Sequence, residues 1–406
     1  MSIMSKLFCR DDIGIDLGAA NMRVWIRGEG LVLEEPSVVA FSTLYESKPR
    51  VLAVGAEALK LVVGKDNVAE QGTGLGCRDK EVRANAFAWA GVLESGAPLT
   101  RRLCVPVGAF PDSSDSSQHL PRRPERTSYL VWPRKAHVVS DVGIAAEMLR
   151  HCFMKAKNAG KSTLRKPRVA ISVPADITDV EKRALEDAAR SAGARKVWVL
   201  DEQMAAALGV GLPARKKGDC MLVDIGASTT KISVPLVAEN VASATCRIGG
   251  DEMNNAIIGY MRSKHNLVIG EREAEAAKIK IGTASTPEKE LDCEIKGLDA
   301  ADGRQLAVTV NSKEIREEAL DRVLGRIEEA ITDFLKVNVS RGLAASLKKN
   351  GVVLAGGSAR LRGLDKRLAA ATGLPVRVAD DPEHATIRGV GVVLDKLDYL
   401  SKRTKK

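Results

Sequence analysis

Residues 13–21 read IGIDLGAAN, and residues 221–234 read MLVDIGASTTKISV. In both stretches an apolar run that suits a buried strand ends in an aspartate, Asp16 or Asp224, followed by one residue and then a glycine. A single stretch of this kind is most simply a plain strand that ends in an Asp turn. Because the chain contains the pattern twice, we interpret the two stretches as parts of one functional site.

A strand that ends in Asp-x-Gly and turns back as a hairpin exposes backbone N–H groups that can bind phosphate oxygens. The carboxylate at the strand end can hold hydrated Mg²⁺ beside those phosphates, and glycine lets the backbone approach them closely. Two such hairpins, one in each of two domains, would hold a nucleoside triphosphate from both sides. Asp16 and Asp224 are therefore the predicted magnesium-binding residues, acting through water molecules.

Length and composition favour a soluble protein of two domains. The chain has 406 residues, of which 45% are hydrophobic and 28% are charged, and such a composition is ordinary for globular proteins. It contains no apolar run long enough to span a membrane. The formal net charge is +10, but aromatic residues make up only 3%, which argues against a stacking surface for nucleic acid. We interpret the charge as solvated surface and predict no nucleic-acid partner.

The cysteines and histidines give no sign of a metal site or of a disulfide framework. The seven cysteines form no CxxC pair and are odd in number, and the five histidines are scattered,. The N-terminus lacks the apolar core and the cleavage site of a secretory signal. These features together predict a protein of the reducing cytosol.

Strand-like and helix-like segments alternate along the chain, which favours parallel α/β units. Residues 178–193 predict a helix that begins with a capping box between Thr178 and Glu181,. Residues 196–211 predict a strand that runs directly into a helix, and residues 216–219 predict a hinge between domains.

Two further segments suit a nucleoside. Residues 351–365 predict a strand, a turn at Gly356 and Gly357, and a helix, and a glycine turn lets the backbone approach a base or sugar closely. Glu275 and Lys278 lie three residues apart and so share one helix face,. They could hold a ribose and adenine there, or they could form an ordinary surface ion pair.

Residues 66–131 interrupt the alternation. The segment contains Gly, Ser and Pro throughout, with arginine pairs, as in PDSSDSSQHLPRRPERTS. This composition is typical of disorder, and a long irregular segment inside a domain usually indicates a functional insertion or a spacer. A third interpretation is an error in the sequence itself.

Five stretches of the chain carry a resemblance to a known family. In chain order they are IGIDLGAANMRVWIRGEGLVLEEPSVVAF, DEQMAAALGVGLP, MLVDIGASTTK, RIGGDEMNNAI and LAGGSARLRGLD. They resemble the successive signatures of the MreB/Mbl family of bacterial actins, over nearly the whole chain outside the insertion. The resemblance implies an α/β protein with the actin-like ATPase fold, in which two RNase-H-like domains, each with a smaller subdomain, hold ATP and Mg²⁺ in a central cleft.

The resemblance also implies a division of the chain. We expect a first domain at 11–216, its smaller subdomain at 40–133 with the insertion 66–131, a second domain at 217–386 with its smaller subdomain at 253–315, and a helix at 387–400 that returns to the first domain. Residues 1–10 would bind the membrane as an amphipathic segment, although a frayed terminus explains their composition nearly as well. Residues 401–406 form a basic tail.

The resemblance assigns a catalytic residue and a set of nucleotide contacts. Glu202 matches the family's water-polarising glutamate, a role that needs a carboxylate fixed at a strand-to-helix turn facing the γ-phosphate. The alternative is an acid that merely favours a helix start. The implied nucleotide-binding residues are Gly18, Ala19, Ala20, Asn21, Gly226, Ala227, Ser228, Thr229, Gly250, Asp251, Glu275, Ala276, Ala277, Lys278, Gly356, Gly357, Ser358, Ala359 and Arg360.

The chain departs from the family pattern near the phosphates. The glycines and the acid of the usual DIGGGTTE are here Ala227, Ser228 and Lys231, a threonine of the first hairpin is Ala19, and the proline after the catalytic glutamate is Gln203. The added Cβ atoms would crowd the backbone that holds the phosphates. We expect nucleotide binding to persist, because its donors are backbone groups, and ATP hydrolysis to be slow.

The function that the resemblance implies is that of an ATP-dependent, filament-forming bacterial actin. Such proteins assemble into double protofilaments in the cytoplasm, on the anionic inner face of the cell membrane, and organise peptidoglycan synthesis with membrane proteins of the elongation complex to determine cell shape. Two alternatives are a small-molecule kinase of the same superfamily, which needs a catalytic aspartate and a substrate pocket, and a chaperone-type ATPase, which needs a peptide-binding domain.

Overall fold

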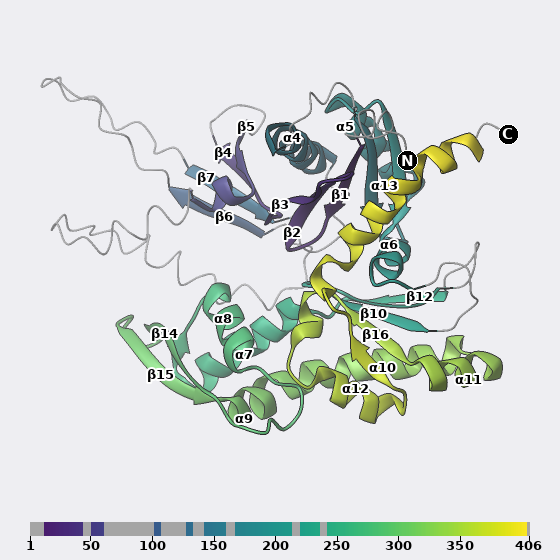
Figure 1. Ribbon diagram of the computed structural model, residues 1–406. Helices are drawn as coiled ribbons and strands as arrows, with labels where there is room; N and C mark the ends of the chain where they lie inside the picture. The colour runs from purple at the N-terminus through teal and green to yellow at the C-terminus, as the bar shows by residue number, and fades with distance from the viewer. Residues whose placement is uncertain are drawn as a thin grey trace, which may run out of the picture.

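Two five-stranded sheets with the same strand plan form the centre of the protein, one in each half of Figure 1. The computed structural model describes residues 12–43, 50–60, 101–106, 127–132, 142–159, 167–212, 220–235 and 242–403. The predicted membrane segment 1–10 and the last residues of the basic tail, 404–406, lie outside this range.

The first sheet has the order β3-β2-β1-β8-β9. Its strands are β1 (Asp12–Leu17), β2 (Asn21–Ile26), β3 (Gly30–Pro36), β8 (Arg168–Val173) and β9 (Lys196–Asp201). β1 pairs antiparallel with β2 and parallel with β8. The first predicted hairpin is therefore formed by β1 and β2, with β1 in the middle of the sheet.

The second sheet has the order β12-β11-β10-β16-β17. Its strands are β10 (Met221–Ile225), β11 (Thr230–Val234), β12 (Ala242–Cys246), β16 (Val352–Ala355) and β17 (Val376–Val378). β10 pairs antiparallel with β11 and parallel with β16. β10 is thus the counterpart of β1, and each central strand carries one of the two predicted magnesium ligands.

Helices cover both faces of the first sheet. They are α4 (Val142–Ala159), α5 (Asp179–Ser191), α6 (Glu202–Gly209) and α13 (Ala385–Arg403). Val169 and Ile171 of β8 pack into the core that α4 and α5 share, whereas Ala170 packs with α13. This alternation follows from the two-residue period of a strand.

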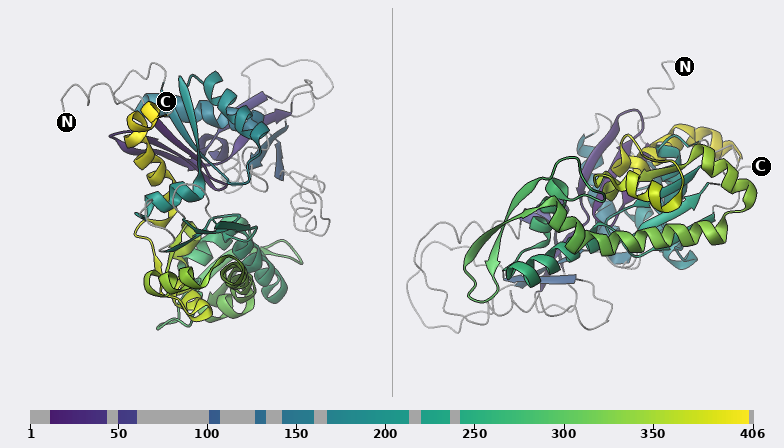
Figure 2. Two further views of the ribbon diagram at one scale, coloured as in Figure 1. Left: turned by 90° about the vertical axis from the view of Figure 1, so that its right-hand side faces the viewer. Right: turned by 90° about the horizontal axis from the view of Figure 1, so that it is seen from below.

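Helix α13 follows the second sheet in sequence and packs against β1, β2 and β8 of the first. Figure 2 shows it in yellow, running from the lower body onto the upper one. It crosses α6 closely: a Cβ at Gly209 would lie 1.8 Å from the Ala385 carbonyl oxygen, and one at Gly389 would lie 1.6 Å from that of Ala205. Glycine is therefore required on both helices at this crossing.

The second body has its own set of helical segments. They are α7 (Gly250–His265), α8 (Glu271–Ile281), α9 (Ser312–Glu314), η2 (Ile315–Leu320), α10 (Asp321–Asn338), α11 (Arg341–Asn350), η3 (Gly357–Arg360), α12 (Leu364–Thr372) and η4 (Pro382–His384). Most of them pack with β10, β11 and β16 around a single large core, which includes Ile225, Ile257 and Phe334.

Each half carries a smaller sheet. One has the order β13-β14-β15, from β13 (Leu267–Val268), β14 (Asp292–Asp299) and β15 (Gln305–Asn311); the other has the order β5-β4-β7-β6, from β4 (Val39–Thr43), β5 (Arg50–Val54), β6 (Arg101–Pro106) and β7 (Thr127–Trp132). The second of these sheets corrects the interpretation of residues 66–131 as disorder. β6 pairs with β7 and β7 pairs with β4, so parts of the segment belong to a sheet, while 66–100 and 107–126 lie outside the described residues.

Two local predictions are confirmed: the capping box at the start of α5, and the strand that runs directly into a helix at residues 196–211. At α5 the Thr178 hydroxyl accepts a hydrogen bond from the Glu181 amide at 3.2 Å, and the Glu181 carboxylate accepts from the Thr178 amide at 2.9 Å. Strand β9 runs directly into α6, which the Asp201 carboxylate caps by accepting from the Met204 amide at 2.8 Å.

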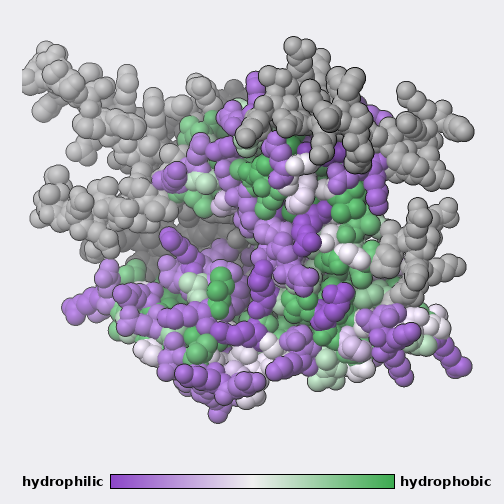
Figure 3. Space-filling model, viewed as in Figure 1, coloured by the Kyte–Doolittle hydropathy of each residue, from purple (hydrophilic) through white to green (hydrophobic). Residues whose placement is uncertain are grey.

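In the part of the chain that the structure describes, no helix has both the length and the apolar composition that a bilayer requires. The face in Figure 3 mixes hydrophilic residues with small separate groups of hydrophobic ones. The most exposed large apolar side chains, Val337, Val180 and Ile279, come from three different helices.

Candidate nucleotide-binding site

The first hairpin places Asp16 near the end of β1. One oxygen of its carboxylate accepts a hydrogen bond from the Ser172 hydroxyl at 2.8 Å, and the other lies 3.6 Å from the Arg23 guanidinium. Asp16 is directly opposite Arg23 in the β1–β2 register. A Cβ at Gly18 would lie 2.8 Å from the Asn21 carbonyl oxygen, so the tight turn requires the glycine of the Asp-x-Gly pattern.

The second hairpin repeats this arrangement. Asp224 on β10 is directly opposite Lys231 on β11, and the Gly226 amide closes the turn by donating to the Thr229 carbonyl at 2.9 Å. Lys231 follows Asp224 by seven residues, as Arg23 follows Asp16. Each hairpin therefore pairs a strand-end carboxylate with a basic residue on the returning strand.

The start of α7 holds the second hairpin in place. The amides of Gly250 and Asp251 donate to the carbonyls of Gly226 and Ala227 at 3.0 and 2.7 Å. The Ser228 hydroxyl donates to the Asp251 carboxylate at 2.9 Å. Gly250 and Asp251 were predicted as nucleotide contacts. Their backbone amides instead donate hydrogen bonds to the hairpin and hold it in place.

Glu275 and Lys278 connect α8 to α7. The Lys278 ammonium donates to the Glu275 carboxylate at 2.7 Å and to the Gly250 carbonyl at 3.2 Å, and the same carboxylate accepts from the Asn254 amide at 2.7 Å. The lysine is buried, while the Glu275 side chain remains 45% exposed. The pair is therefore more than a surface ion pair, and only its glutamate presents much surface to a ligand.

The turn at Gly356 lies against the second hairpin. Gly356 has φ +82°, and a Cβ there would lie 2.4 Å from an Asp224 carboxylate oxygen. The Ser358 hydroxyl donates to the Gly226 carbonyl at 3.0 Å, and a Cβ at Gly250 would lie 2.8 Å from that hydroxyl oxygen. A Cβ at Gly357, by contrast, would meet no atom within 4 Å. The turn leaves an open stretch of backbone beside the hairpin.

Several predicted contacts do not present a side chain to this site. Ala277 and Ala359 are buried in the core of the second body. Arg360 donates two hydrogen bonds to Glu383, both at 2.7 Å, so its guanidinium is held at the connection to α13. Ala276 is exposed on α8, and Ala19, Ala20 and Asn21 are partly exposed at the first turn.

Glu202, the first residue of α6, interacts electrostatically with charged residues of both hairpins. Burial raises its pKa, Lys231 opposes this shift, and Asp224 and Asp16 add to it,. Burial also raises the pKa of Asp224, with a further contribution from Asp16. The three carboxylates come from both domains and are close enough to repel one another. Carboxylate oxygens such as those of Asp16 and Asp224 are the donors that suit Mg²⁺ held through water, and the glycine turns beside them suit phosphate and sugar.

Lys231 forms an ion pair with Glu202 that was not predicted from the sequence. Its ammonium lies 2.6 Å from Oε1 of Glu202, and the two side chains are only 17% and 15% exposed. Burial works against the charge of Lys231, but Glu202, Asp224 and Asp16 outweigh it and raise the pKa of the lysine. The equal spacing from Asp16 to Arg23 and from Asp224 to Lys231 places a basic residue opposite each aspartate in the hairpins, but no spacing in the sequence indicates the contact with Glu202.

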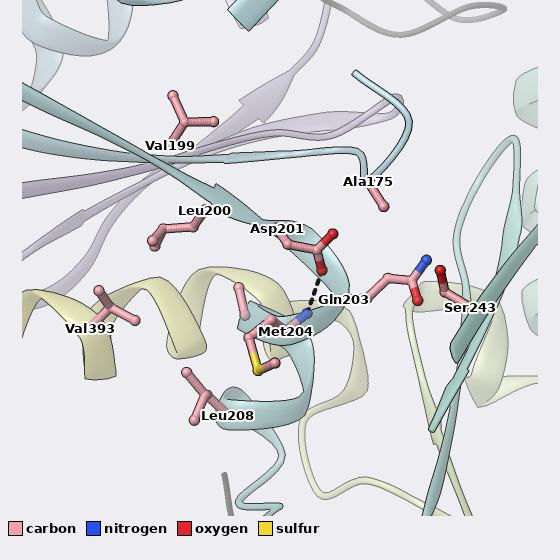
Figure 4. Close-up of a pocket in the computed structure, with 10 residues that line it drawn as sticks. Ala175, Val199, Leu200, Asp201, Gln203, Met204, Leu208, Ser243 and Val393 are labelled. Atoms are coloured by element: carbon pink, nitrogen blue, oxygen red, sulfur yellow. Dashed lines mark hydrogen bonds between the residues drawn. The ribbon is translucent and has the colours of Figure 1, made fainter. Parts of the chain in front are cut away.

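A separate cavity of about 390 Å³ lies behind α6. Figure 4 shows mainly apolar side chains around it, from β9, α6 and α13, with Gln203 and Ser243 at one end. Oε1 of Gln203 is buried and accepts no hydrogen bond. None of the predicted nucleotide-binding residues lines this cavity.

Comparison with known proteins shows similarity to the MreB/Mbl family along most of the chain. The family model for the MreB/Mbl protein matches residues 10–69 and 114–402. The cell shape-determining protein MreB of Escherichia coli strain K12 is 34% identical over 389 residues, which cover 96% of this chain and 94% of that protein. The unmatched residues 70–113 fall within the predicted insertion.

Solved structures show the same fold. The crystal structure of MreB5 of Spiroplasma citri bound to AMPPNP has a TM-score of 0.73 at 23% identity, covering 97% of this chain and 99% of that one. The MamK double helical filament has a TM-score of 0.60 at 19% identity, covering 94% and 98%. The fold is therefore that of the actin-like ATPases, as the sequence predicted.

Proposed function

Because this chain belongs to the MreB/Mbl family, we propose that it is an ATP-binding bacterial actin that polymerises into filaments and organises cell-wall synthesis at the membrane. The E. coli relative is a cell shape-determining protein, which supports a cytoskeletal role in cell shape. The observation that carries the proposal is the pair of equivalent hairpins, each with its aspartate on the central strand of one of two like sheets.

The nucleotide would lie between the hairpins. The backbone at Gly18 and Gly226 would face the phosphates, and the open turn at Gly356 and Gly357 would face the nucleoside,. MreB5 of Spiroplasma citri was solved with AMPPNP and with ADP, which supports nucleotide binding here. Asp16 and Asp224 would hold hydrated Mg²⁺, which when bound offsets the negative charge of the phosphates.

Glu202 would orient the water that attacks the γ-phosphate. It stands at the junction of β9 and α6, where the Asp201 cap fixes the first turn of the helix. A carboxylate fixed in this way can hold a water in line for attack. We propose that ATP hydrolysis takes place here and is slow.

Self-association is the expected use of the nucleotide. MamK, which shares the fold, forms a double helical filament, and we propose double protofilaments for this chain. An anionic membrane surface would bind residues 1–10. Membrane proteins of the elongation complex would bind the filament on the cytoplasmic side.

Sedimentation tests the proposal. We expect the protein to pellet with ATP and Mg²⁺ and to stay in the supernatant without nucleotide, and we expect Asp224→Ala to abolish pelleting because it removes a metal ligand. Wild-type protein that binds AMPPNP but never pellets would contradict the proposal that the protein forms filaments. Phosphorylation of a small molecule would then favour a kinase, and ATP-dependent release of an unfolded peptide would favour a chaperone.

Vesicle flotation tests the membrane contact. We expect filaments to float with vesicles that contain phosphatidylglycerol and not with neutral ones, because the attraction is to anionic headgroups. Deletion of residues 1–10 should reduce flotation and leave pelleting intact. Equal flotation after the deletion would show that this segment is not the anchor.

A further inference from the structure

We propose that Lys231 restrains the catalytic carboxylate Glu202 and thereby lengthens the life of the ATP-bound state. The inference rests on the proposed function, since it concerns the same cleft. Its structural basis is the contact between the Lys231 ammonium and Oε1 of Glu202, which are 2.6 Å apart. Lys231 reaches this position from β11, where it is directly opposite Asp224.

The ion pair joins the second hairpin to the first domain. Glu202 belongs to α6, beside the first sheet, and Lys231 belongs to the second sheet. Both side chains are largely withdrawn from water, so the attraction between them is stronger than that of a surface pair. Separating such a pair without compensation is costly, because it leaves a buried charge unpaired.

The contact conflicts with the role of Glu202 in hydrolysis. To orient an attacking water, the carboxylate must accept a hydrogen bond from it within about 3 Å. The Lys231 ammonium lies within that distance of Oε1 as an ion-pair partner, without the geometry of a hydrogen bond, and Oε1 has no access to solvent. Water can take up the position at Oε1 only when the ion pair opens, and the pair fixes the orientation of the whole carboxylate, so we expect hydrolysis to be slow until it opens.

The equivalent residue of the first hairpin has different partners. Arg23 lies 2.8 Å from Glu34 and 3.6 Å from Asp16. Lys231 is therefore the hairpin cation that reaches Glu202, although both cations have the same spacing from their aspartates. Lys231 is a positioning residue, because it acts through Glu202.

The test measures phosphate release and AMPPNP affinity in the full-length protein. Lys231→Met removes the charge and keeps much of the side-chain length. Because its loss also lets burial, Asp224 and Asp16 raise the pKa of Glu202 further, release at saturating ATP is measured over a series of rising pH values. We expect the rate to exceed that of the wild type by on the order of tenfold at the upper end of the series, where Glu202 is ionised. AMPPNP affinity should stay within a few fold. Filaments formed with ATP should disassemble correspondingly sooner.

Three further variants sharpen the result. Lys231→Gln, a second neutral variant, should give the same rise as Lys231→Met if the effect is due to charge. Lys231→Arg keeps the charge and should retain the low rate. Lys155→Met is the matched control, because it also removes one lysine from an ion pair, with Glu35 of the first domain, and it should leave the rate at the wild-type value.

The outcomes separate the inference from the proposed function. An unchanged or lower rate in both neutral variants, with AMPPNP affinity retained, overturns the restraint. Loss of AMPPNP binding in both also overturns it and makes Lys231 a phosphate-binding residue instead. Wild-type protein that binds no AMPPNP contradicts the proposed function together with the inference.

Discussion

His384 lies just before α13 and bonds to Glu34 of β3, with its Nε2 atom 3.0 Å from the Glu34 carboxylate. Its Nδ1 atom lies 2.8 Å from Asp381. Glu34 in turn holds Arg23, which lies 3.6 Å from Asp16. A continuous series of polar contacts therefore runs from the connection between the bodies to the first phosphate hairpin.

This series predicts a pH dependence of stability. Burial disfavours the charge of His384, but Glu34 and Asp381 outweigh it and raise its pKa. A raised pKa means that the folded state binds the proton more tightly than the unfolded state, so the stabilisation is complete below the ordinary value of 6.5 and is lost as pH rises through the raised value,.

Urea unfolding of the wild type and of His384→Gln checks this prediction. The difference in the free energy of unfolding should be largest below pH 6.5 and should shrink as the pH rises above it through the raised pKa of His384,. A difference that stays the same across this range would show that the imidazole acts through packing and neutral hydrogen bonds only.

Gly356→Ala should damage both stability and nucleotide binding. The residue has φ +82°, and the added Cβ would lie 2.4 Å from the Asp224 carboxylate. We expect a loss of ~1–3 kcal/mol in the free energy of unfolding and weaker AMPPNP binding. The matched control is Gly325→Ala within α10, where a Cβ meets no atom within 4 Å, and which should be neutral or slightly stabilising. Equal stability of the two variants would contradict the account.

Glu202→Ala should abolish ATP turnover and leave AMPPNP affinity within a few fold. The reason is that the carboxylate orients water and does not itself hold phosphate. Phosphate release by the purified variant, measured beside AMPPNP titration, decides the point. Full turnover in Glu202→Ala would show that another group activates the water.

Slow hydrolysis has two proposed causes: crowding by the Cβ atoms of Ala227 and Ser228, and restraint of Glu202 by Lys231. Restoring the family's glycines by Ala227→Gly and Ser228→Gly tests the first cause separately. Removal of the Cβ atoms should raise turnover if crowding displaces the phosphates, because a shift of ~1 Å can cost about a hundredfold in rate. Ser228 also donates to Asp251, so the double variant loosens the hairpin, and we expect a smaller gain than Lys231→Met gives. No gain would remove crowding as a cause.

The sequence was sufficient for the features that are local. The two hairpins, the capped start of α5 and the step from β9 into α6 depend on residues that are neighbours in the chain, so their spacing alone predicts them. The repeated pattern at Asp16 and Asp224 predicted one hairpin in each domain, whereas the two-domain fold was implied by the family resemblance and the strand order is known from the structure.

Contacts between segments that are distant in the sequence could not be predicted from it. The pairing of Lys231 with Glu202 depends on how two domains meet, and that of Arg360 with Glu383 depends on the path into α13. The strand β6 was missed because the polar composition around it is typical of disorder, whereas its place is set by pairing with β7. In each case tertiary packing, rather than local propensity, decides the structure.

The central claim is that both hairpins hold one nucleotide, and calorimetric titration of AMPPNP with Mg²⁺ tests it most directly. We predict one nucleotide per chain for the wild type, and a loss of about tenfold or more in affinity for both Asp16→Asn and Asp224→Asn, because each removes one carboxylate from the metal site. Wild-type affinity in either variant would contradict the account, since it would show that one hairpin is enough.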